Sequence, residues 1–297
     1  MAATAEDLLK EGRIEEAMQA LQDKIRKSPG DGKLRVFLFQ LLVVQGAWER
    51  ALTQLQVNNE LDPATLPMVQ TYRELIQCEV FRRDVFAGRR SPLLFGEPAQ
   101  WMARMVQALH LHATGETAAA EALWDEAYAE APATGGTVDG QPFTWIADAD
   151  NRLGPLLEAI VNGQYYWIPF AKIRGITVDP PADLRDMVWT PVHFTWSNGG
   201  ETVGFLPTRY AGSEAAADPL LRLSRKTEWG ELVGEYYQGL GQRMFATDEG
   251  DHPLLEIREI ALDSEPVACP EPEGEPGAEG EPVPSGDAPA APAAPAG

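Results

Sequence analysis

Apolar residues recur every three or four positions through the first third of the chain, a spacing that predicts amphipathic helices. From residue 9 to residue 63 this helical pattern repeats with a period of 34. In each copy a glycine comes where a first helix ends, because the tight turn there favours positive φ, and a proline, which has no amide hydrogen, stops a second helix. Each copy therefore predicts a pair of helices. The matching positions are Gly12 and Gly46, Ile14 and Trp48, Ala17 and Ala51, Leu21 and Leu55, and Pro29 and Pro63.

A third copy of these five positions stands 103 residues after the first, behind an insertion whose own pattern is helical. This period, with a small residue where two helices cross and a proline at the end, is typical of the tetratricopeptide repeat (TPR), in which helix pairs stack and leave a concave groove. We therefore expect residues 1–133 to form a TPR-like helical domain. The third copy consists of Gly115, Thr117, Ala120, Trp124 and Pro132.

The pattern changes at residues 134–137, where threonines flank two glycines. After a helix-like piece at residues 152–162, apolar residues alternate with polar ones, which predicts strands. Asn198–Gly199 indicates a hairpin turn, because both positions readily take positive φ. Residues 134–262 are therefore interpreted as a mainly antiparallel β-rich domain, which makes the whole an α+β fold. The expected strands cover residues 165–170, 173–178, 188–196, 202–206, 243–247 and 254–262.

The last segment, residues 263–297, has eight acidic residues, nine prolines and no basic residue. Such a sequence cannot bury enough apolar surface to fold, so it predicts a disordered acidic tail rich in proline and alanine. The net charge of the whole chain is −21. Nucleic-acid binding requires clustered lysine and arginine, and we therefore expect no nucleic-acid partner.

The sequence also predicts a cytoplasmic protein without a membrane partner. No apolar run approaches the roughly 18 residues that a membrane span needs. The acidic N-terminus has none of the features of a signal peptide. Two cysteines, Cys78 and Cys269, are too few for a disulfide framework.

Catalytic chemistry is not evident. His110 and His112 are two residues apart and so point to different faces of a helix. The chain has neither a nucleotide-binding glycine loop nor a recognisable nucleophile elbow. We expect a protein that is not an enzyme and that carries no cofactor or metal.

The segment 139–152 is the strongest candidate for a special site, because Asp148, Asp150 and Asn151 match the start of a calcium-binding loop. Arg152 stands at the third ligand position, however, and a leucine follows where that loop needs glycine. The alternative kept open is a metal site, a small-molecule site or an enzyme's active site in this loop. The favoured interpretation is a structural loop, in which the carboxylates cap a following helix and pair with the arginine to hold the two halves of the chain together. Its residues are Asp139, Asp148, Asp150 and Arg152.

Several phrases follow one another in an order that resembles the ImpE/TagJ family, over roughly residues 5–262. Members of that family are accessory proteins of bacterial type VI secretion systems. The resemblance implies a cytoplasmic adaptor that binds a helical segment of the small subunit of the contractile sheath. It also implies an influence on sheath assembly or recycling, with the sheath-recycling unfoldase as an indirect partner. The phrases are KLRVFLFQLL, WERAL, LDP, QTYRE, FAGRRSPLLFGEP, DGQPFTWIADADNRLGPLLEAIVNGQYYWIPF, DLRDMVWTP, NGGE, LPTRY, RKTEW and GQR.

A TPR-like stack binds peptides through the first helix of each pair, which lines its groove. Aligning the copies on their central alanine selects the positions that face this groove. For each apolar position the alternative is packing against a neighbouring helix. The predicted partner contacts are Lys33, Val36, Gln40, Val43, Met105, Leu109 and His112.

Overall fold

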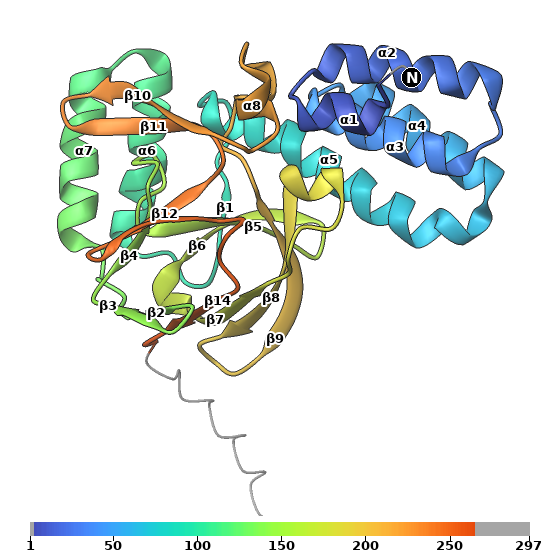
Figure 1. Ribbon diagram of the computed structural model, residues 1–297. Coiled ribbons are helices and arrows are strands. Elements are labelled where there is room, and N and C mark those ends of the chain that lie inside the picture. Colours follow the sequence, from blue (N-terminus) through green and yellow to red (C-terminus); the bar gives the residue numbers. More distant parts are fainter. Residues whose placement is uncertain (1–2, 265–297) are drawn as a thin grey trace, which may run out of the picture. The chain divides into compact units, whose positions relative to one another are not determined.

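The computed structural model describes residues 3–264 (Figure 1). The predicted tail, residues 263–297, lies outside this part of the chain except for its first two residues. The helices are α1 (Ala5–Lys10), α2 (Ile14–Lys27), α3 (Gly32–Val44), α4 (Trp48–Leu61), α5 (Leu66–Phe86), α6 (Gln100–Thr114), α7 (Thr117–Glu130) and α8 (Pro219–Arg222). Short 3-10 helices are η1 (Pro63–Thr65), η2 (Phe170–Lys172), η3 (Leu184–Met187) and η4 (Ser213–Ala215).

The first two helix pairs, α1–α2 and α3–α4, have the ends that the repeat predicts. Gly12 and Gly46 follow the first helix of each pair with φ of 77° and 65°, where a side chain would cause strain. Ala17 and Ala51 are fully buried. Asp31 begins α3 by accepting hydrogen bonds from two backbone amides of the first turn. The TPR prediction is confirmed for these pairs.

The third pair, α6–α7, forms as predicted but does not continue the stack. In Figure 1 it stands beside the hairpin of β10 (Thr227–Val233) and β11 (Tyr236–Gly241), apart from α1–α4. Trp124 of α7 packs against Tyr236 of this hairpin, with ring centroids 5.2 Å apart. The hairpin therefore covers a face that a neighbouring helix pair would cover in a continuous TPR array.

The second half is mainly antiparallel β structure, as predicted. Its largest sheet has nine strands in the order β1-β6-β5-β9-β8-β7-β14-β2-β3, and β1 pairs with β6 in parallel. The predicted hairpin joins β8 to β9, but of the two turn positions expected to take positive φ only Gly199 does so, at 83°, and Asn198 does not. Two smaller sheets contain β13-β12-β4 and β10-β11. The remaining bounds are β1 (Leu93–Leu94), β2 (Gly136–Val138), β3 (Gln141–Phe143), β4 (Ile146–Asp148), β5 (Leu156–Val161), β6 (Gln164–Pro169), β7 (Ile173–Val178), β8 (Trp189–Trp196), β9 (Glu201–Pro207), β12 (Met244–Thr247), β13 (Gly250–Pro253) and β14 (Glu259–Leu262).

Two predicted segments differ from the structure. Residues 152–162, expected to be helix-like, form a turn followed by strand β5. Every residue of β5 is buried, including the charged Glu158, and a short run without alternation cannot be distinguished from a buried helix by periodicity. The strand expected over residues 254–262 is limited to β14, because residues 254–256 form a turn.

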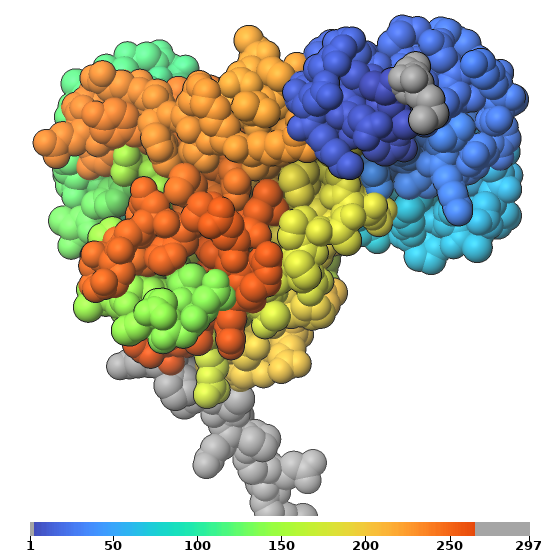
Figure 2. Space-filling view, viewed as in Figure 1, coloured from blue at the N-terminus to red at the C-terminus, as the bar shows by residue number. Residues whose placement is uncertain are grey.

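The helices and the sheet share an apolar core. Along β5, Leu156 and Ile160 belong to the cluster that contains the helices, whereas Leu157 and Val161 belong to a second cluster across the sheet. Trp167 of β6 is fully buried against α5. Segments far apart in sequence also meet near α8, where Figure 2 shows atoms of the orange segment touching the blue N-terminal helices. One such contact is the ion pair between Arg222 and Glu15, at 2.9 Å.

Candidate functional site

A buried network of ion pairs includes Asp148 of the loop at residues 139–152. Arg243 donates hydrogen bonds to both Asp148 and Glu158. Glu158 also accepts from the guanidinium of Arg82, at 2.7 and 2.9 Å. These four side chains are between 0 and 2 % exposed. Because Arg82 is on α5 and Arg243 precedes β12, the network connects the helices to the sheet.

The network sets the protonation of its two carboxylates. Burial on its own favours the neutral form of Glu158, but Arg82 and Arg243 outweigh burial and hold the pKa of Glu158 at about 2. Burial raises the pKa of Asp148 to about 7, and the attraction of Arg243 opposes this change. Both carboxylates are enclosed and already paired with arginine, so neither is available to a ligand.

The other charged groups of the loop are also paired within the protein. Asp150 pairs with Arg152 at 2.5 Å and accepts the backbone N–H of Gly239 at 3.0 Å. The carboxylate of Asp139 accepts backbone N–H groups of β14 and the residue before it, at 2.8 and 2.9 Å. No helix follows for these carboxylates to cap, because residues 152–155 turn into β5. Asp148, moreover, pairs with Arg243 and not with Arg152.

This geometry gives no support to a metal site in the loop. Within residues 3–264, no group of three or more histidine, cysteine, aspartate or glutamate side chains is placed to hold a metal ion. Over the same residues, 3–264, no helix has the length and apolar character needed to cross a bilayer.

A groove of about 840 Å³ lies between α3 and the end of α4, and we call it the α3–α4 groove. Lys33, Val36 and Gln40, three of the predicted contact residues, line it. Asn58 also lines it, and its buried amide makes no hydrogen bond with any described residue. Leu61 is 46 % exposed in the same lining. The groove thus combines apolar surface with an amide that lacks a partner. The other lining residues are Gly30, Asp31, Gly32, Phe37, Asp62, Thr65 and Asp183.

The remaining predicted contact residues do not line this groove. Val43, Met105 and Leu109 are 0 to 2 % exposed, so they pack in the core. His112 is half-buried beside Trp124, with ring centroids 5.7 Å apart, and burial lowers the pKa of its imidazole. The residues from the second and third copies do not form one surface, because α6–α7 lies apart from α3.

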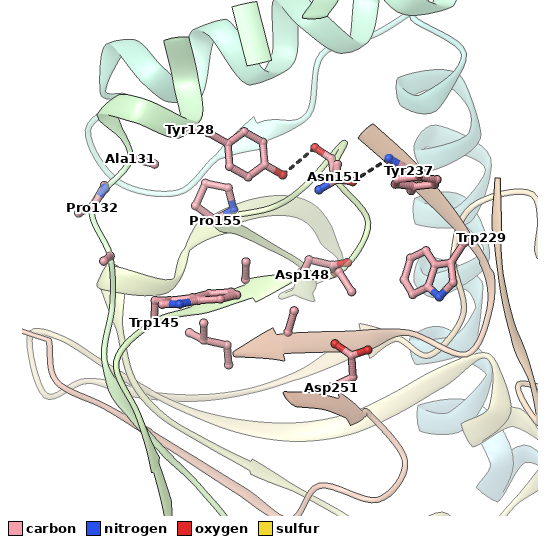
Figure 3. Close-up of a pocket in the computed structure, with 15 residues that line it drawn as sticks. Tyr128, Ala131, Pro132, Trp145, Asp148, Asn151, Pro155, Trp229, Tyr237 and Asp251 are labelled. Atoms are coloured by element: carbon pink, nitrogen blue, oxygen red, sulfur yellow. Dashed lines mark hydrogen bonds between the residues drawn. The ribbon is translucent and has the colours of Figure 1, made fainter. Parts of the chain in front are cut away.

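A second hollow, of about 660 Å³, lies between the end of α7, residues 145–151 and the β10–β11 hairpin (Figure 3). We call it the aromatic hollow, because Trp145, Trp229 and Tyr237 line it. Their side chains are 39, 42 and 44 % exposed, respectively. Asn151 connects its walls: its carbonyl accepts the hydroxyl of Tyr128 at 3.0 Å, and its side-chain oxygen accepts the amide of Tyr237 at 2.7 Å. This side of the protein therefore has a braced hollow with apolar walls.

Several residues of these two sites escape sequence reasoning. Asn58 comes three residues after Leu55 on α4, so the helical period does place its amide on the inward face. That signal is available in the sequence. The sequence does not indicate that Trp145 and Trp229 share one hollow. They meet because of the β10–β11 hairpin, which the pattern of hydrophobic and polar residues does not predict.

Comparisons with known proteins match both halves of the chain. A tetratricopeptide-repeat family model matches residues 8–72, and the model of the ImpE protein family matches residues 140–261. The chain is 50 % identical over 269 residues to the type VI secretion system accessory component TagJ of Pseudomonas aeruginosa, which covers 90 % of this chain and 93 % of that protein. A crystal structure of a Vibrio parahaemolyticus protein is similar, with a TM-score of 0.81 at 26 % identity, covering 88 % of this chain and 98 % of the other.

Proposed function

This chain belongs to the ImpE/TagJ family of type VI secretion accessory components, and we propose that it acts as a non-catalytic adaptor that binds a helical segment of the small contractile-sheath subunit. Binding would take place in the cytoplasm and would modulate sheath assembly or recycling. The sheath-recycling unfoldase would be involved only through the sheath subunit. TPR helices and an accessory role support a protein partner as the ligand.

The observation that carries this proposal is the lining of the α3–α4 groove. Val36 and the exposed Leu61 provide apolar surface against which the apolar stripe of a helix can pack. Lys33 is exposed in the same groove and can pair with an acidic residue of that helix. Gln40 and Asn58 supply amide groups, and the unpaired amide of Asn58 gains most from a polar partner.

The alternative of a small-molecule site or enzyme in loop 139–152 has weaker support. Its carboxylates are paired with Arg152, with Arg243 or with backbone amides. Perturbed pKa values at Asp148 and Glu158 have a sufficient cause in the network between α5 and the sheet. A structural role therefore accounts for the chemistry of this loop.

Co-purification with the small sheath subunit tests the proposal. We expect the tagged full-length protein to recover that subunit, and a Leu61→Asp variant to recover at least about tenfold less, because a carboxylate replaces an apolar contact. Val203→Asp is the matched control, since Val203 is 65 % exposed on β9 and lines neither the groove nor the aromatic hollow. If Leu61→Asp and Val203→Asp recover the subunit as well as the unaltered protein does, the groove is not the binding surface. If no folded form recovers it, the adaptor proposal fails.

A further inference from the structure

The exposed aromatic side chains of the described chain gather in one place. Among its exposed large apolar residues, three are aromatic, and all three line the aromatic hollow. They come from separate elements: Trp145 precedes β4, Trp229 is on β10 and Tyr237 is on β11. Figure 3 shows the rings of Trp145 and Trp229 on opposite sides of the hollow. Exposed tryptophan and tyrosine around a concavity are typical of binding hot spots.

The walls of the hollow are braced before any ligand arrives. Asn151 joins α7 to β11 through the two hydrogen bonds described above. Trp229 rests on the ring of Tyr210, with centroids 5.7 Å apart. A rigid, preformed hollow loses little entropy when a partner binds, which favours its use as a docking site.

The charge around the hollow selects the partner. Its lining contains no lysine, arginine or histidine, but it contains the exposed Asp251. Asp248 adds a second negative charge next to the hollow, because its carboxylate is held by the amide and hydroxyl of Thr144, the residue before Trp145. These hydrogen bonds lower the pKa of Asp248, so it stays ionised. Tryptophan faces also attract cations.

From these observations we propose that the aromatic hollow is a second docking site, separate from the α3–α4 groove, for a basic amphipathic segment of a protein partner. A large apolar side chain of that segment enters between Trp145 and Trp229. Its lysine or arginine neighbours lie over the rings and face Asp251 and Asp248. An acidic segment is repelled by these carboxylates, and a purely polar one leaves the rings exposed to water.

A fluorescence-polarisation titration of the full-length protein tests this site. The probe is a short fluorescein-labelled peptide with leucine on one face of a helix and lysine on the other. Two further peptides replace lysine by glutamate, or leucine by serine. We expect the leucine–lysine peptide to bind and the other two to bind at least about tenfold more weakly.

The variants locate the site of binding. Trp229→Ala and Trp145→Ala each reduce affinity for the leucine–lysine peptide by about tenfold or more, and Asp251→Asn reduces it several-fold at low salt and less at high salt. Both tryptophans are about two-fifths exposed, so circular dichroism and thermal melting should show that the variants remain folded. Val203→Ala, and Leu61→Asp in the groove, should leave the affinity unchanged.

The proposal is overturned if both tryptophan variants bind the peptide normally, or if the glutamate peptide binds equally well. It is also overturned if Leu61→Asp abolishes binding, because the peptide then occupies the α3–α4 groove. Since the sheath subunit is not used, failure here leaves the adaptor proposal intact, and failure of that proposal does not affect this result.

Discussion

Replacing Arg243 by leucine should destabilise the protein more than replacing any exposed arginine. Arg243 is fully buried and is the cation next to Asp148. In the variant, Glu158 still accepts both hydrogen bonds from the guanidinium of Arg82. Asp148 still accepts the backbone N–H of Asp150 at 2.9 Å but has lost its arginine. The variant therefore leaves one carboxylate enclosed without a cation.

Removing one partner of a buried ion pair costs about 3–5 kcal/mol, because the remaining charge is neither hydrated nor paired. The free energy of unfolding of a domain is about 5–15 kcal/mol, so the variant should still fold but should lose a large part of that free energy. With a urea m-value of about 3 kcal/mol/M, the unfolding midpoint falls by about 1 M or more.

Urea unfolding followed by circular dichroism measures this change. Arg174→Leu is the matched control, since Arg174 is exposed on β7, and its midpoint should move by a few tenths of a molar at most. Adding Asp148→Leu to Arg243→Leu should recover part of the loss, because the stranded charge is then gone. The loss should also be smaller at pH 5 than at pH 8, since protonation neutralises the enclosed carboxyl of Asp148. If Arg243→Leu unfolds at the same urea concentration as Arg174→Leu, the network does not stabilise the fold and the reasoning is wrong.

Three further predictions concern stability and are measured by the same unfolding assay. Folding lowers the pKa of Glu158 from its ordinary 4.5 to about 2. The ionised form therefore adds about 3 kcal/mol to the free energy of unfolding above pH 4.5, and this contribution is lost as the pH falls through about 2. The stability of Glu158→Gln should lack this dependence on acid pH. Gly154→Ala should lower the free energy of unfolding by about 2 kcal/mol or more, since Gly154 has φ of 51° and a methyl group there would lie 2.2 Å from the hydroxyl of Tyr128. Gly140 has φ of 79° but open space around it, so Gly140→Ala should lower it by only about 1 kcal/mol. Arg209→Ala should lower the free energy of unfolding by about 3 kcal/mol, because the guanidinium donates to two carbonyls at the end of α3, at 2.7 and 2.9 Å. If Arg209→Ala is as stable as the unaltered protein, these hydrogen bonds do not stabilise the fold.

The elements with strong local signals are the ones that the sequence predicts. Gly12 and Gly46 adopt positive φ, which glycine tolerates best, so the residue type itself marks these helix ends in the sequence. The Asn198–Gly199 pair likewise marks the β8–β9 turn in the sequence, although only Gly199 takes positive φ there. Strand β5 has no such signal, because both of its faces are buried and its residues carry no alternation.

The arrangement of the candidate sites depends on contacts that are distant in sequence. Lys33, Val36 and Gln40 share one groove because they lie on one helix, which periodicity can predict. Met105 does not join them, because α6–α7 packs beside the β10–β11 hairpin, where Trp124 contacts Tyr236. The partner of Asp148 is 95 residues further along the chain, so sequence spacing favours the nearer Arg152.

Hydrogen exchange on the full-length protein, with and without the small sheath subunit, tests the adaptor account most directly. Backbone amides of residues 32–44 and 48–61, which form α3 and α4, should exchange more slowly when the subunit is bound, because a partner helix in the α3–α4 groove would protect them. Protection confined to the region of the aromatic hollow, or no protection in α3 and α4 while the complex forms, would contradict binding in the groove.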